Sequence, residues 1–145
     1  SGAGAEVQAI AEHFAAQGRK TKQLTVSHAF HSPLMEPVLD DFRAVAESLT
    51  YNQPRIPFVS TVTGESVTEE LTTAAYWTEH IRKPVRLTDA LAQLARTGTS
   101  VFLEIGPDAV LTALGPATHD DATYIAAQRR DRSEERELAS ALGVL

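Results

Sequence analysis

Segments with helical periodicity alternate with short β-branched runs along this chain, and this alternation most restricts its fold. Residues 6–17 place apolar side chains at helical spacing, and residues 23–26 alternate as in a half-buried strand. The same reasoning predicts, in order, a helix from about Pro37 to residue 49, a strand at 56–62, helices at 74–81 and 87–95, a strand at 101–105, a helix around 110–114, a strand at 123–126 and a helix from Ser133. This alternation is typical of α/β proteins with a largely parallel sheet.

The composition narrows the possible function classes. At 145 residues the chain can bury one core, and no apolar run is long enough to span a membrane. The formal net charge of −6 argues against non-specific nucleic-acid binding, which needs a basic surface. The sequence has no cysteine, so disulfides, thiol nucleophiles and thiolate metal sites are excluded, and a cytoplasmic location is expected.

Two histidines, His28 and His31, lie between the predicted strand at 23–26 and the helix that follows. The junction of a strand and a helix is where α/β enzymes often place catalytic groups. From these residues alone, His31 is either a general base or a structural histidine. A metal site at the two histidines is unsupported, because Glu36 is the only carboxylate nearby.

A second turn, Glu104-Ile105-Gly106-Pro107, follows the predicted strand at 101–105. Its backbone N–H groups either bind an anion or form an ordinary strand-to-helix turn, and the sequence leaves both alternatives open. The chain contains neither a Gly-x-Ser-x-Gly nucleophile elbow nor a glycine-rich phosphate loop. A histidine base would therefore need a nucleophile from outside the motifs present.

Several blocks of sequence resemble one protein family, in order and at compatible spacing. The blocks are Val26-Ser27-His28-Ala29-Phe30-His31-Ser32-Pro33-Leu34-Met35-Glu36-Pro37, Tyr76-Trp77 with Pro84-Val85, Phe102-Leu103-Glu104-Ile105-Gly106-Pro107 with Val110-Leu111-Thr112, and Ala127-Gln128-Arg129-Arg130-Asp131-Arg132. Together they resemble the acyltransferase domains of type I modular polyketide synthases, relatives of malonyl-CoA:acyl-carrier-protein transacylase. The chain resembles only the C-terminal portion of such a domain.

The resemblance implies a particular fold. Members of this family have a large α/β-hydrolase-like subdomain into which a small ferredoxin-like subdomain is inserted. Residues 1–27 would be the last helix and strand of the ferredoxin-like subdomain, and residues 28–145 the C-terminal part of the large subdomain. The family's nucleophilic serine would lie upstream of this sequence, and we expect the chain to be a piece of something larger.

The resemblance also implies site residues. His31 would be the catalytic base of a Ser–His pair, and the backbone carbonyl of His80 would orient it. His28, Ala29 and Phe30 would select the substrate, because the His-Ala-Phe-His form tracks with malonyl units and a Tyr-Ala-Ser-His form with methylmalonyl units. Phe30 would fill the space that an α-methyl group needs, or it would simply pack in the core.

The implied reaction is a ping-pong transfer of a malonyl group from malonyl-CoA to the phosphopantetheine thiol of an acyl carrier protein. The chain itself would bind no cofactor and no metal. Its partners would be the acyl carrier protein, the missing N-terminal half of the acyltransferase domain and a neighbouring ketosynthase domain, with neither nucleic acid nor a membrane. The alternative is a non-enzymatic fragment or docking piece that is inactive without its upstream half.

Overall fold

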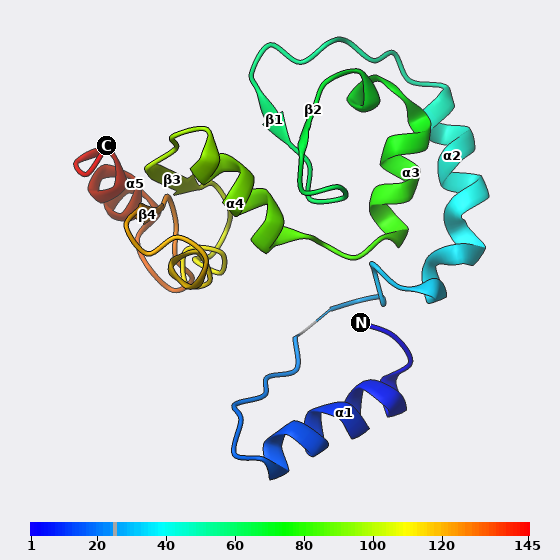
Figure 1. Ribbon diagram of the computed structural model, residues 1–145, viewed down its shortest axis with the longest axis horizontal. Helices are drawn as coiled ribbons and strands as arrows, with labels where there is room; N and C mark the ends of the chain where they lie inside the picture. Colours follow the sequence, from blue (N-terminus) through cyan, green and yellow to red (C-terminus); the bar gives the residue numbers. More distant parts are fainter. Residues whose placement is uncertain (25) are drawn as a thin grey trace. The chain divides into compact units, whose positions relative to one another are not determined.

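The computed structural model describes residues 1–24 and 26–145 and divides the chain into two compact units (Figure 1). The first unit is formed by Ser1–Phe58 and Val67–Val85, and the second by Val59–Ser66 and Arg86–Leu145. In the described part of the chain, no helix is both long and apolar enough to cross a membrane.

Helix α1 (Gly4–Ala16) opens the first unit, as the periodicity of residues 6–17 predicts, and it buries none of its residues. Gly18 ends this helix with a φ of 75°, a left-handed conformation that glycine adopts at little cost. The strand predicted at 23–26 is wrong for its described residues; Thr25 lies outside them. Leu24 and Val26 are each 68% exposed, and no described strand pairs with this segment, so its alternating pattern has no sheet to join.

A helical pair forms the core of the first unit. The 3₁₀ helix η1 (Pro33–Val38) leads into α2 (Leu39–Glu47), which packs along α3 (Ala74–Arg82) (Figure 1). Pro37 has no N–H to donate, which explains why the regular helix begins only at Leu39. The buried side chains of η1, α2, α3 and η2 (Glu69–Thr72) are Met35, Ala46, Leu71, Tyr76 and Thr78.

The start of α3 agrees with the helix predicted from residue 74, and a threonine caps it. The Thr73 hydroxyl accepts a hydrogen bond from the backbone N–H of Tyr76 at 3.3 Å. On the same helix, Trp77 Nε1 donates to the carbonyl of Leu71 at 3.0 Å. These bonds tie α3 to η2 and set the direction in which α3 leaves the turn.

The strand predicted at 56–62 is much shorter in the structure. β1 spans Phe58–Val59 and pairs with β2 (Ser66–Val67) in a two-stranded sheet. Pro57 cannot donate to a ladder, and Ile56 before it is 79% exposed, so pairing begins only after the proline. Only the end of the predicted strand is buried, at Ser60 and Val62.

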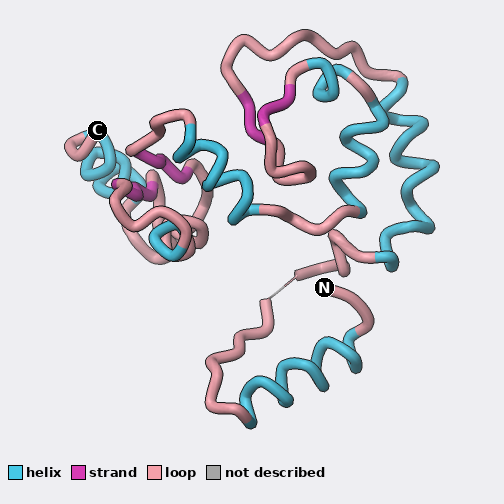
Figure 2. The backbone as a smooth tube through the Cα atoms, viewed as in Figure 1, coloured by secondary structure: helices cyan, strands magenta, loops and turns pink. Residues whose placement is uncertain are grey.

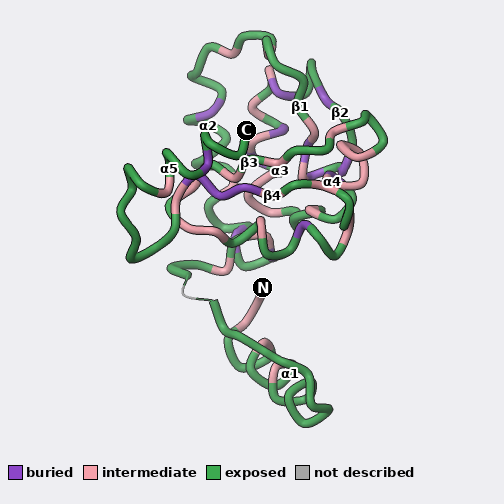
Figure 3. Tube along the Cα trace, turned by 90° about the vertical axis from the view of Figure 1, so that its left-hand side faces the viewer, coloured by how far each residue is buried: buried purple, intermediate pink, exposed green. Residues whose placement is uncertain are grey.

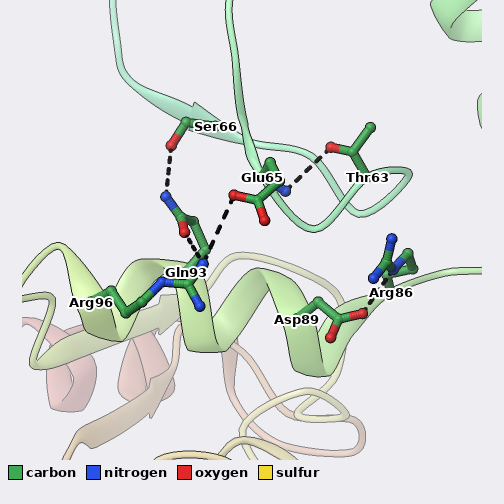
Figure 4. Close-up of polar contacts among 7 residues, drawn as sticks. All are labelled: Thr63, Glu65, Ser66, Arg86, Asp89, Gln93 and Arg96. Atoms are coloured by element: carbon green, nitrogen blue, oxygen red, sulfur yellow. Dashed lines mark hydrogen bonds and ion pairs between the residues drawn. The ribbon is translucent and has the colours of Figure 1, made fainter.

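In the second unit, side chains of α4 (Leu87–Arg96) hold the turn that follows β1 (Figure 4). Gln93 Nε2 donates to Ser66 Oγ at 3.3 Å, and the Arg96 guanidinium lies 3.8 Å from the Glu65 carboxylate. Gly64 has a φ of 78°, and a Cβ there would lie 2.5 Å from Asp89 Cβ. This position therefore requires glycine both for its conformation and for the close approach of α4.

A parallel strand pair carries the rest of the second unit. β3 (Val101–Glu104) and β4 (Thr123–Ala126) run parallel in register from Val101 opposite Thr123 to Glu104 opposite Ala126. Both strands and their parallel direction confirm the prediction. The end of β4 is buried (Figure 3), and α5 (Glu134–Leu142), predicted from Ser133, packs against this strand.

The helix predicted around 110–114 is wrong. The segment between β3 and β4 is loop apart from the 3₁₀ turn η3 (Gly115–Ala117) (Figure 2). The carboxylate of Glu104 accepts hydrogen bonds from the N–H groups of Val110, Leu111 and Thr112 at 3.0, 3.0 and 2.8 Å. The Glu104 carboxylate thus holds this segment as a turn around the end of β3.

Candidate active site

His31 lies in the turn before η1 and is bound to the end of α3 by two hydrogen bonds. Its backbone N–H donates to the carbonyl of Ile81 at 2.8 Å, and its Nδ1 lies 2.9 Å from the carbonyl oxygen of Lys83. A carbonyl oxygen only accepts, so Nδ1 carries the proton of this bond. In the neutral ring, Nε2 therefore keeps its lone pair and can act as a base.

The expectation that the backbone carbonyl of His80 orients this ring is not met. The partner of His31 Nδ1 is the carbonyl of Lys83, three residues further along. Lys83 has left the helix α3 and has an extended backbone, with a φ of −74° and a ψ of 149°. The chain can therefore aim the Lys83 carbonyl at a neighbouring turn.

The side chain of His80 lies beside His31 instead. The two ring centroids are 6.1 Å apart, edge to face, and the rings of Tyr76 and Trp77 lie 6.1 and 6.2 Å from that of His80. Burial lowers the pKa of His80, and the neighbouring His31 lowers it further, against a smaller opposing effect from a backbone hydrogen bond. The lowered pKa disfavours the charged form of His80, and with it a second positive charge next to His31.

The predicted specificity residues lie on the same turn, on its exposed side. The Phe30 ring is between its neighbours, 6.0 Å from the His28 ring and 6.5 Å from the His31 ring. Phe30 is 43% exposed and is not a core residue of the described chain. The backbone carbonyl of Ala29 accepts a hydrogen bond from the Ser32 hydroxyl. The structure thus brings His28, Ala29, Phe30 and His31 together on one turn.

Residues that the motif reasoning did not single out hold this turn in place. Ser32 is almost fully buried, and the Arg82 guanidinium on α3 pairs with the Glu36 carboxylate on η1 at 2.9 Å. The ion pair is partly exposed and stabilises little by itself, but it links the two elements that flank His31. A serine directly before a proline at a helix start is an N-cap pattern, and this signal would have identified Ser32.

Two other ligand sites considered from the sequence find no support in the geometry. Within residues 1–24 and 26–145, no three His, Cys, Asp or Glu side chains come together as a metal site would require. The backbone N–H groups of the Glu104 turn bind the protein's own carboxylate. Burial acts to raise the pKa of Glu104, but these three hydrogen bonds outweigh it and lower the pKa. An external anion would have to displace Glu104.

The arrangement at His31 fits proton transfer to and from a hydroxyl or thiol. Nε2 is the nitrogen left available, and the Lys83 carbonyl fixes the tautomer and stabilises the imidazolium that forms when Nε2 takes a proton. In the described part of the chain, no serine or threonine hydroxyl is hydrogen-bonded to His31 Nε2. Within the described residues, the turn thus holds an imidazole whose Nδ1 has a backbone partner and whose Nε2 has no hydroxyl partner.

Comparison with known proteins assigns this arrangement to a family. The family model "Acyl transferase domain" matches residues 1–142. The chain belongs to the acyl transferase domain family. Among curated relatives, polyketide synthase GfsA of Streptomyces halstedii is 49% identical over 132 residues, which are 88% of this chain and 2% of that protein.

Solved acyltransferase domains have the same fold. The acyltransferase domain from the second module of the salinomycin polyketide synthase is 50% identical with a TM-score of 0.86, over 97% of this chain and 34% of that one. The malonyl-transacylase PlMCAT, solved in complex with the acyl carrier protein AntF of a type II polyketide synthase, is 25% identical with a TM-score of 0.79, over 96% of this chain and 44% of that one. The acyl transferase chain described here thus spans less than half of these structures.

Proposed function

We propose that this acyl transferase chain supplies the catalytic base for transfer of a malonyl group from malonyl-CoA to the phosphopantetheine thiol of an acyl carrier protein. The observation that supports it most is the hydrogen bond from His31 Nδ1–H to the Lys83 carbonyl, which leaves Nε2 as the basic nitrogen. The matched family and the likeness to polyketide synthase acyltransferase domains agree with this reaction class. The acyl carrier protein in the PlMCAT complex supports the choice of acceptor.

The proposed reaction has two half-reactions that both use His31. Nε2 takes the proton of a serine hydroxyl as its oxygen attacks the malonyl thioester carbonyl, and the imidazolium returns this proton to the departing CoA thiol. The phosphopantetheine thiol then gives its proton to Nε2 as its sulfur attacks the acyl-serine, and the proton returns to the serine oxygen. The serine would come from the part of the domain that this chain does not span.

The division of the chain is part of the same proposal. Residues 1–27 would end a ferredoxin-like small subdomain, and residues 28–145 would be the C-terminal part of an α/β-hydrolase-like large subdomain. What supports it is that α1 buries none of its residues, whereas the segment from η1 onward packs against α3. The remainder of the acyltransferase domain and a neighbouring ketosynthase domain would be its partners, with no resident cofactor or metal. A cytoplasmic location stays a prediction.

A chimeric domain tests the proposal. This chain replaces the matching segment in the salinomycin second-module acyltransferase domain, which supplies the remaining two-thirds of the fold. We expect the chimera to become malonylated by malonyl-CoA and to pass the group to an acyl carrier protein, as measured by intact mass. The isolated chain should acquire no adduct. A stable malonyl adduct on the isolated chain would contradict the missing serine, and an inert, folded chimera would favour a non-enzymatic docking piece.

Phe30 provides a test of substrate choice. Changing Phe30→Ser in the chimera removes a ring beside His31. The ratio of kcat/KM for methylmalonyl-CoA to kcat/KM for malonyl-CoA should therefore rise by about 5- to 30-fold. The range corresponds to about 1–2 kcal/mol, the usual effect of one methyl group in a pocket. Competition between the two substrates, read by mass, measures it. Phe14→Ser on α1, a phenylalanine that is 37% exposed, is the matched control and should leave this ratio of kcat/KM values unchanged.

A further inference from the structure

We infer that Ser32 is a positioning residue for His31: its hydroxyl closes the turn that holds the imidazole against the Lys83 carbonyl. This inference rests on the proposed role of His31 as a base. Ser32 does not touch the reacting atoms in this account, and it acts only through the conformation of the turn.

The backbone of His31 explains why the turn needs to be held. Its φ is 63°, a left-handed conformation that is unfavourable for a residue with a Cβ and persists only where the surroundings impose it. Two hydrogen bonds to Ile81 and Lys83 hold His31 from the side of α3. These two bonds come from the N–H and the ring of His31 itself. The residues before and after His31 must therefore be held by other groups.

Ser32 fixes these neighbours. It is 2% exposed, and its hydroxyl donates to the carbonyl of Ala29 at 2.6 Å and accepts from the N–H of Leu34 at 3.3 Å. The two partners stand on opposite sides of His31 in the sequence, so one buried hydroxyl spans the strained residue. A hydroxyl has both the donor and the acceptor that this bridge needs.

The donated bond distinguishes this role from ordinary helix capping. An N-cap needs only an acceptor for the N–H groups of the first turn, which the bond from Leu34 already satisfies. The bond to the Ala29 carbonyl runs backward across His31 and contributes nothing to η1. Without it, His31 is free to relax to a negative φ, which carries Nδ1 away from Lys83 and leaves the tautomer unspecified.

The test combines kinetics of the chimera with NMR of the histidine ring. We expect Ser32→Ala to lower kcat about tenfold, equal to about 1.4 kcal/mol, with an unchanged KM because no substrate contact is lost. Ser32→Thr, which keeps both hydrogen-bonding groups, should restore kcat. The ¹⁵N shifts of His31 in the isolated chain should report the Nδ1–H tautomer in the wild type and a mixture of tautomers in Ser32→Ala.

Ser48→Ala is the matched control. The Ser48 hydroxyl also donates to the carbonyl three residues before it, Val45, at 2.7 Å, but at the end of α2. Its removal should change neither kcat nor the His31 tautomer. If Ser32→Ala does not fold, Ser32→Gly replaces it, because glycine is well tolerated at an N-cap and also lacks the hydroxyl.

Three results would overturn the inference: an unchanged kcat in the folded hydroxyl-free variant, an unchanged His31 tautomer, or an equal loss of kcat in Ser32→Thr and Ser32→Ala. The last result would assign the effect to packing. Failure of the proposed function gives a different pattern, in which removal of the His31 ring itself leaves transfer intact.

Discussion

Replacing His31 with alanine in the chimeric domain should lower kcat for malonyl transfer by about 10³-fold, the usual effect of removing a general acid–base group. In the proposed reaction both half-reactions move a proton through Nε2, the nitrogen left available by the bond from Nδ1 to the Lys83 carbonyl. Intact-mass kinetics with malonyl-CoA, followed by addition of an acyl carrier protein, measure each half-reaction separately. Both should slow.

His13→Ala is the control for this prediction. His13 lies on α1, where its Nε2 is 2.8 Å from Gln17 Nε2, so its ring already has a local partner. In His13→Ala, the rates of both half-reactions should stay within twofold of those of the unmutated chimera. Malonyl transfer that survives in the His31→Ala chimera at the unmutated rate would refute the assignment of His31 as the base.

Replacing Glu104 with alanine should lower the free energy of unfolding of the second unit by about 2 kcal/mol. The change removes a carboxylate that accepts from three backbone N–H groups, and each such charge-assisted bond stabilises a protein by about 1.5–3 kcal/mol. The turn is largely exposed, so water replaces part of what is lost, and we expect well under the sum. Urea unfolding at pH 7 measures the difference, and Glu104→Gln should lose less because it retains one acceptor oxygen.

The effect of Glu104 should depend on pH in a defined direction. The folded state lowers the pKa of Glu104 from its ordinary value of 4.5, so the folded protein binds the proton less readily than the unfolded chain. The associated stability is fully present above pH 4.5 and is lost as the pH falls through the folded pKa. The difference in unfolding free energy between the wild type and Glu104→Ala should therefore become smaller in strong acid.

Glu65→Ala serves as the reference for this pair of measurements. Glu65 belongs to the same unit, and its carboxylate makes only an exposed contact of 3.8 Å with Arg96. The substitution should change the unfolding free energy by no more than about 0.5 kcal/mol. If Glu104→Ala lowers the unfolding free energy as little as Glu65→Ala does, the turn at Glu104 is held by other contacts.

Local chemistry was enough to predict the helices α3 and α4. The helix predicted at 74–81 and the helix predicted at 87–95 each needed only their own apolar spacing. Both signals lie within the segment that folds, so no distant residue is required to interpret them. The parallel direction of the strands at 101–104 and 123–126 agrees with the sheet type predicted from the alternation of helices and strands.

Two of the failed predictions depended on groups outside the segment concerned. Residues 23–26 have the alternation of a strand, but a strand exists only beside another strand, and none is described next to this segment. Residues 110–114 have helical spacing, but the carboxylate of Glu104 holds their N–H groups in a turn. A pattern in one segment carries no information about such a competitor, because the competitor belongs to another part of the chain.

The sequence by itself determined that His31 is the candidate base, that its turn carries His28, Ala29 and Phe30, and that the chain resembles a malonyl acyltransferase. Only the tertiary structure decided which group orients the base. Lys83 is 52 residues from His31, and the choice between its carbonyl and that of His80 depends on where α3 ends and how the chain leaves it. Every residue has the same backbone carbonyl, so residue types cannot distinguish one acceptor from another. The path of the folded chain makes that distinction.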